Sequence, residues 1–137
     1  MRATHRRGAA ATELALFLPF LALLFFVAVD YARAFRAAQV IDGCARTGAL
    51  YASGAAGRDP DAATPEQAAV QAAVAQGADL SPPLQPGNVT ITTGAGTVTV
   101  TVSYQFAMAT GYVGSPNGLT ISRAVTMPIA PKPPGAR

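Results

Sequence analysis

The residue types that most often carry enzyme chemistry are scarce in this sequence. Among 137 residues there is one histidine, His5, and one cysteine, Cys44. One histidine excludes a multi-histidine metal site within this sequence, and one cysteine excludes an internal disulfide and a multi-cysteine zinc site. A serine–histidine–aspartate triad would have to use His5. We therefore predict no catalytic residues, no metal, no cofactor and no enzymatic activity.

The charged residues are few and unevenly placed. They make up 12% of the chain, against about 25% in typical soluble domains. The formal net charge is +3, and three of the ten basic residues precede Gly8, namely Arg2, Arg6 and Arg7. Beyond Gly8 the basic and acidic residues are equal in number, and no basic cluster remains. We therefore expect no nucleic-acid binding. With no catalytic residues predicted, we also expect no small-molecule substrate.

Glu13 is the most unusual of these charges, because it directly precedes the uncharged run Leu14–Val29, LALFLPFLALLFFVAV. Counted from Ala9, a helix through this run would be about 32 Å long, enough to cross a hydrocarbon core of about 30 Å. Pro19 lies inside the run, and membrane helices tolerate proline. A carboxylate in a membrane helix costs roughly 2.5–3.5 kcal/mol at the centre and less near the end. We predict a basic leader over residues 1–8 and a transmembrane helix over 9–29 with its basic end in the cytoplasm.

Three interpretations of this segment are possible. It could be a cleaved secretory signal with Ala32-Arg33-Ala34 as the cleavage site, which would release a secreted carbohydrate- or protein-binding module. The long apolar run and the charges of Asp30 and Arg33 speak against that interpretation. It could also be a plain uncleaved anchor with Glu13 at the membrane interface. The third interpretation is a prepilin-type segment cut after Gly8.

Cleavage after Gly8 would place a free amine on Ala9 and make Glu13 the fifth residue of the mature chain. The amine of one subunit could then pair with Glu13 of the next and cancel two charges in a low-dielectric setting. That pairing would also set the axial stagger between neighbouring helices. Gly8 and Ala9 are thus the candidate cleavage site, and Glu13 is the candidate register residue.

Basic residues, a glycine, four residues, a glutamate and a long apolar helix form the processing motif of type IV pilin-like precursors. The segments RRGAAATELALFLPFLALLFFVAVDYARAF and CARTGALYAS extend this likeness. Over about residues 5–53 the chain resembles the TadE-like family of tight-adherence (Flp) pilus systems. The resemblance implies a minor pilin or pseudopilin that a prepilin peptidase trims and that packs with other pilin-like subunits.

The same resemblance implies a bacterial inner-membrane protein that crosses the membrane once, with a cytoplasmic N-terminus, an extracytoplasmic C-terminal domain and possible incorporation in a pilus. An uncleaved, membrane-anchored scaffold of the pilus or secretion machinery is the alternative. Helical spacing of small and apolar residues continues past Asp30 to about Ser53. We predict an extramembrane continuation of the helix over residues 30–53.

Pro19, Gly43 and Gly48 are candidate helix-packing residues. The partner at the two glycines would be either another subunit or the chain's own sheet, and we favour the sheet. Cys44 lies on the same small-residue stripe and is predicted to be a buried thiol. Arg46 could bond carbonyls at the helix end or pair with Asp42, four residues earlier.

Residues 54–87 are predicted to form a loop and a short helix. Thr64 is a candidate N-cap, Pro65 suits the first helical position, and Gln67 completes a capping box. The helix should end at Gly77 and, because its apolar side chains are small, pack lightly as a lid or spacer.

Residues 88–129 are predicted to form an antiparallel β region, because apolar residues alternate with threonines from Val98 to Phe106. A shorter strand at Val89–Ile91 would precede a hairpin turn at 94–96, and a third would follow around 119–127. We expect an α+β fold with the long helix packed on a sheet of about three strands, Tyr104 and Phe106 in the core, and a flexible tail at 130–137.

Overall fold

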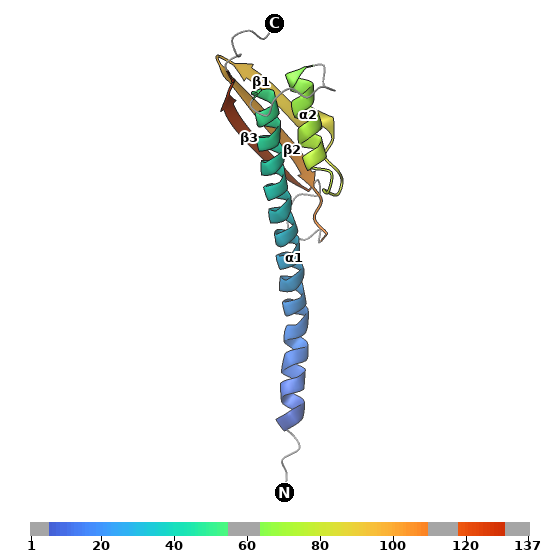
Figure 1. Ribbon diagram of the computed structural model, residues 1–137. Coiled ribbons are helices and arrows are strands. Elements are labelled where there is room, and N and C mark those ends of the chain that lie inside the picture. The colour runs from blue at the N-terminus through green and yellow to red at the C-terminus, as the bar shows by residue number, and fades with distance from the viewer. Residues whose placement is uncertain (1–5, 55–63, 110–117, 131–137) are drawn as a thin grey trace, which may run out of the picture.

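A computed structural model describes residues 6–54, 64–109 and 118–130. The parts of the predicted leader, loop, β region and tail that fall at residues 1–5, 55–63, 110–117 and 131–137, His5 among them, lie outside these ranges. The elements in chain order are α1 (Arg6–Ala52), α2 (Pro65–Gln76), a short 3-10 helix (Pro86–Asn88), β1 (Val89–Gly94), β2 (Thr97–Phe106) and β3 (Leu119–Pro128). Figure 1 shows the sheet and α2 packed around one end of α1. The predicted α+β class, with a long apolar helix and three antiparallel strands, is confirmed.

Helix α1 is one continuous rod of 47 residues that passes through Pro19 without a break. At about 1.5 Å per residue it is roughly 70 Å long. The proline removes one backbone donor and leaves the carbonyl of Ala15, four residues earlier, without its helical partner. The helix ends where Gly54 adopts a φ of 77°, a conformation that glycine adopts without steric cost.

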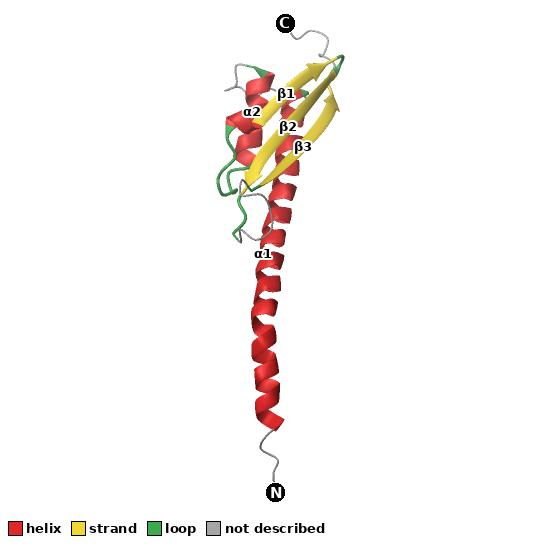
Figure 2. Ribbon diagram, turned by 180° about the vertical axis from the view of Figure 1, so that it is seen from behind, coloured by secondary structure: helices red, strands yellow, loops and turns green. Residues whose placement is uncertain are grey.

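The sheet has the order β1-β2-β3, and both pairings are antiparallel. One face of β2 is buried against α1 and the other carries exposed or half-buried hydroxyl residues, as the alternation predicted. Figure 2 shows this outer face, with α1 behind the sheet. The buried residues of β2 are Val98, Val100, Val102, Tyr104 and Phe106.

The hairpin turn and the helix N-cap are formed by residues close together in the sequence. Gly94 ends β1 and Thr97 begins β2, and Gly96 between them has a φ of 76°. The Oγ1 of Thr64 accepts a 3.2 Å hydrogen bond from the Gln67 N–H and caps α2. The predicted hairpin turn and helix N-terminus are therefore both confirmed.

Helix α2 is more than the lightly packed spacer that its composition suggested. Its residues Ala69 and Ala73 are fully buried. A Cβ placed on Gly48 of α1 would lie 3.4 Å from the Ala69 carbonyl oxygen and 3.5 Å from the Ala73 Cβ. Small side chains bring the two helices close together instead of leaving them loosely apposed.

Candidate functional site

The predicted cleavage site lies in the first turn of α1. Gly8 is exposed, and a Cβ built on it would meet nothing within 4 Å. Its carbonyl accepts a 3.4 Å hydrogen bond from the Thr12 hydroxyl. The bond between Gly8 and Ala9 thus lies at a helix end, where the backbone frays most easily.

Glu13 lies in the next turn, on an exposed part of α1. Within the described residues it forms no ion pair; the two ion pairs there join other residues of the chain. Glu13 and Ala9 are four residues apart and therefore share one face of the helix. The Glu13 side chain is exposed, so its carboxylate is accessible to another molecule.

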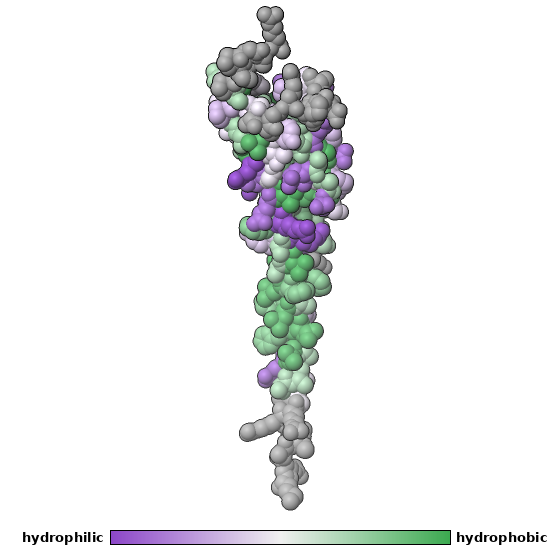
Figure 3. All heavy atoms as spheres, viewed as in Figure 1, coloured by the Kyte–Doolittle hydropathy of each residue, from purple (hydrophilic) through white to green (hydrophobic). Residues whose placement is uncertain are grey.

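The surface of α1 from Leu14 to Val29 carries no charged residue on any side. Figure 3 shows it as a hydrophobic shaft that projects from the folded domain. The helix contains an 18-residue window of mean hydropathy 2.3, none of it buried inside the structure, and is long and apolar enough to cross a membrane. Large side chains on this shaft are 41–76% exposed, including Leu16, Phe17, Phe25 and Val29. An apolar surface of this extent is typical of a membrane or protein contact, and Pro19 lies exposed within it.

The two candidate packing glycines have different surroundings. A Cβ on Gly48 would lie 3.1 Å from Val100 Cγ1, so the chain's own sheet and α2 occupy this position. A Cβ on Gly43 would meet nothing within 4 Å. Cys44, next to Gly43, is fully buried, and burial raises the pKa of its thiol above the usual value.

Asp30 is the feature that the sequence did not identify as a site. It is 5% exposed and comes directly after the uncharged run. Its Oδ1 accepts a 3.1 Å hydrogen bond from Arg33 and another, also 3.1 Å, from the backbone N–H of Ala109. The pair of Asp30 with Arg33 could have been predicted, because residues three apart in a helix are neighbours. The contact with Ala109 could not, because no sequence pattern near Asp30 indicates it.

Arg33, which donates a hydrogen bond to Asp30, also contacts the sheet. Its guanidinium carbon lies 5.4 Å from the centre of the Phe106 ring, within the range of a cation–π contact. Tyr104 and Phe106 are 4% and 5% exposed, so the prediction that both belong to the core is confirmed. Burial raises the pKa of Tyr104, and the nearby charge of Arg33 partly opposes that rise.

Arg46 pairs with Asp42, one of the two partners that the sequence left open. Its Nη2 lies 2.9 Å from Asp42 Oδ2, and its Nε donates to the same oxygen at 3.0 Å. The Arg46 side chain is 67% exposed. An exposed pair at this spacing stabilises a helix by only about 0.3–0.5 kcal/mol.

Across the three described ranges, no three histidine, cysteine, aspartate or glutamate side chains come together in a way that could hold a metal ion. The expectation that the chain uses no metal or cofactor stays a prediction. The arrangement that the structure does show is a long apolar helix with Gly8, Ala9 and Glu13 at one end and a packed domain at the other (Figure 1).

Comparison with known proteins agrees with this arrangement. No curated protein and no solved structure matches the chain. A family model described as TadE-like protein matches residues 8–50, which run from the predicted cleavage site almost to the end of α1. A match to this family over the N-terminal helix suggests a pilus-associated, membrane-anchored protein of a structural type. The resemblance to the TadE-like family is therefore confirmed over residues 8–50, the segment that the family model matches.

Proposed function

We propose that this protein is a structural subunit of a bacterial Tad (Flp) type IV pilus-like system, cut after Gly8 by a prepilin peptidase. The single observation that carries the proposal is the exposed carboxylate of Glu13 at the start of an apolar shaft that the chain's own domain leaves uncovered. A helix of this kind is built for contact with lipid or with other helices rather than for a core of its own.

The spacing of the charges supports an assembly role. The amine that cleavage would create on Ala9 lies one helical turn, about 5–6 Å, before Glu13. A neighbouring subunit shifted along the helix axis brings its amine to this Glu13. Two charges that are costly in hydrocarbon then neutralise each other. Because only one axial shift achieves this contact, the pair fixes the register of packing.

The proposed partners follow from the same geometry. They are the prepilin peptidase, which acts on the Gly8–Ala9 bond, and other pilin-like subunits, which pack on the apolar shaft. The proposed location is the bacterial inner membrane, with the basic end of α1 in the cytoplasm and the α2–sheet domain outside.

Cleavage is tested by the intact mass of the protein from host membranes, with and without the prepilin peptidase. Loss of residues 1–8 only in the presence of the peptidase is the expected result. A full-length mass in both strains contradicts the proposal and favours an uncleaved anchored scaffold. A chain beginning at Phe35 contradicts it differently, because the apolar segment would then be only a secretion signal.

Assembly is tested separately with Glu13→Ala. This variant should be cleaved normally but lost from the sedimentable filament fraction, because the amine of the neighbour has no carboxylate to meet. Glu66→Ala is the matched control, since Glu66 is an exposed glutamate in the first turn of α2. Equal filament yields from the two variants would refute the register role of Glu13.

A further inference from the structure

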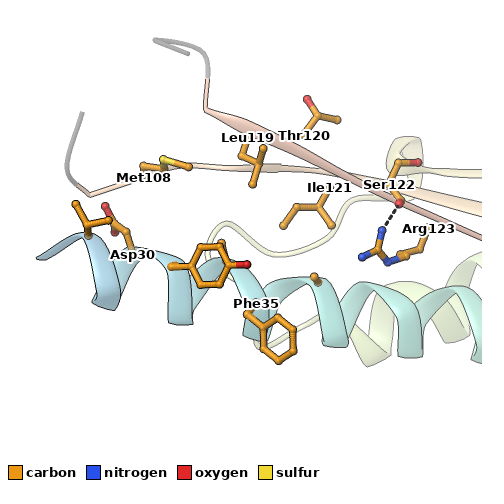
Figure 4. A pocket seen from close by; sticks show the side chains of 12 residues that line it. Asp30, Phe35, Met108, Leu119, Thr120, Ile121, Ser122 and Arg123 are labelled. Atoms are coloured by element: carbon orange, nitrogen blue, oxygen red, sulfur yellow. Dashed lines mark hydrogen bonds between the residues drawn. The ribbon is translucent and has the colours of Figure 1, made fainter. Parts of the chain in front are cut away.

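A groove runs between α1 and β3 at the end of the domain from which the apolar shaft projects. Its volume is about 670 Å³. On α1 it extends from Val27 to Ala38, and on the other side it is bordered by Met108 and by residues 119–123 of β3. Figure 4 shows Asp30 and Met108 near one end and Arg123 toward the other. We call this feature the α1–β3 groove.

The groove begins at the depth where α1 would leave a membrane. A hydrocarbon core of about 30 Å takes about 20 helical residues. If one boundary lies between Ala10 and Leu14, the other falls between Val29 and Arg33. The groove therefore opens inside the hydrocarbon at Val27. It ends at Ala38, about 8–14 Å beyond the boundary by helical rise, next to a headgroup layer about 5–7 Å thick.

Most of the residues that line the groove are apolar, and one of them, Val27, belongs to the uncharged run of the shaft. Its lining includes Phe35 and Leu119, which are 59% and 43% exposed, and Tyr31, which is 76% exposed. Aromatic residues at this depth are typical of membrane–water interfaces. An acyl chain that leaves the bilayer along Val27 would remain in contact with apolar side chains throughout the lower part of the groove.

The two polar ends of the groove differ in charge. At the membrane end, Asp30 already accepts hydrogen bonds from Arg33 and Ala109. At the far end, the Nη1 of Arg123 donates to the neighbouring Ser122 carbonyl at 3.1 Å. Within the described residues no carboxylate pairs with Arg123, because the ion pairs there belong to Arg33 and Arg46. A guanidinium on a flexible stem can reach a phosphate in the headgroup layer.

We propose that the α1–β3 groove binds one anionic phospholipid, with an acyl chain along Val27, Tyr31 and Leu119 and its phosphate at Arg123. The proposal requires that α1 crosses a membrane, but it is independent of cleavage after Gly8 and of filament assembly. A bound lipid would fill the apolar space between the helix and the edge of the sheet and hold the domain upright on the membrane surface.

The test is native mass spectrometry of the full chain in detergent, with added phosphatidylglycerol or phosphatidylcholine of identical acyl chains. We expect one retained lipid per chain and an affinity about fivefold higher for phosphatidylglycerol, as one cation near a membrane surface contributes. Arg123→Gln should lower phosphatidylglycerol binding to the phosphatidylcholine level. Arg36→Gln, an exposed arginine of α1 outside the groove, should retain the preference.

Leu119→Ser should weaken binding of both lipids, because it removes acyl contacts and keeps the cation. Thermal unfolding of each variant checks that the domain is intact. Equal affinity of the wild-type chain for the two lipids, or equal losses in the Arg123 and Arg36 variants, would overturn the proposal. Lipid-free dimers that Leu119→Ser dissociates would also overturn it, and would assign the groove to a second copy of the chain.

Discussion

The Asp30 carboxylate and the backbone N–H of Ala109 are 79 residues apart in sequence and 3.1 Å apart in space. At the other end of the domain, the Ala130 N–H donates a 2.9 Å hydrogen bond to the Ser53 carbonyl. From Asp30 to Ser53, the residue that follows α1, the chain rises about 35 Å, and a ten-residue strand spans about 33 Å. Hydrogen bonds therefore join the helix to the chain near both ends of the sheet. The Asp30–Ala109 bond lies where α1 leaves the proposed membrane.

Asp30→Ala should destabilise the domain by about 2 kcal/mol, because the Ala109 N–H and the Arg33 guanidinium lose a buried acceptor. Pulse proteolysis of the full chain in detergent measures the free energy of unfolding. Asp42→Ala is the control, because it removes the exposed pair with Arg46 and should cost less than about 0.5 kcal/mol. Equal costs for the two variants would show that the Asp30 contact does not stabilise the domain.

Replacing Gly43 or Gly48 with a larger residue should have opposite effects on the stability of the domain. Gly48→Leu should destabilise by about 2 kcal/mol or more, because its Cβ would already lie 3.1 Å from Val100 Cγ1. Gly43→Leu should be neutral or stabilise by about 0.5–1 kcal/mol, because leucine favours the helix and the space is open. Chemical unfolding of the two variants against the wild-type chain measures both changes.

The same Gly43→Leu variant also tests whether another subunit packs at this position. A stable, correctly cleaved Gly43→Leu protein that fails to enter filaments would place a partner against Gly43. Normal filament yield would remove Gly43 from the assembly surface while leaving the role of Glu13 untouched.

Cys44 should resist thiol reagents in the folded protein. It is fully buried, and its raised pKa lowers the fraction of reactive thiolate. We expect modification at neutral pH to be at least about 100-fold slower than in denaturant, because it requires opening of the domain. Ala52→Cys in a Cys44→Ser background, at a half-buried position, is the comparison and should react faster. Rapid labelling of native Cys44 would show that its thiol is not buried in the core.

Tyr104 should make the stability of the domain fall at alkaline pH. Its pKa in the folded state is raised above the ordinary value of 10.0, so the neutral phenol is favoured by folding. The contribution is fully present below pH 10 and is lost as the pH rises through the folded-state pKa. Its hydroxyl also donates a 3.0 Å hydrogen bond to the Pro82 carbonyl.

Tyr104→Phe isolates this effect, because the two proteins differ only at residue 104. The variant should lose about 1 kcal/mol at neutral pH with the hydrogen bond. Above pH 10 the wild-type advantage should shrink, by at most about 1.4 kcal/mol per pH unit. A difference between the two proteins that stays constant from pH 8 to pH 11 would refute the assignment.

Much of the architecture could be predicted because local patterns carry it. The uncharged run after Glu13 and the small-residue spacing beyond Asp30 indicated one long helix, and the structure has it from Arg6 to Ala52. The Thr64 cap, the turn at Gly96 and the alternation in β2 each depend on residues close together in sequence. The close packing of α2 was not predicted. A high alanine content shows that the side chains of a helix are small, but it does not show how closely the helix approaches its neighbour.

The amino-acid sequence was enough to predict the elements, their order and the likeness of the N-terminal segment to the TadE-like family. Helical periodicity, strand alternation, caps and the glycine–glutamate spacing are short-range properties that can be read from neighbouring residues. Three features could be seen only in the folded structure. Asp30 contacts Ala109, the space beside Gly48 is occupied by β2 and α2 while the space beside Gly43 is open, and a groove between α1 and β3 ends at Arg123. Those features arise from contacts between distant segments, whose angle and separation depend on the summed packing of the core.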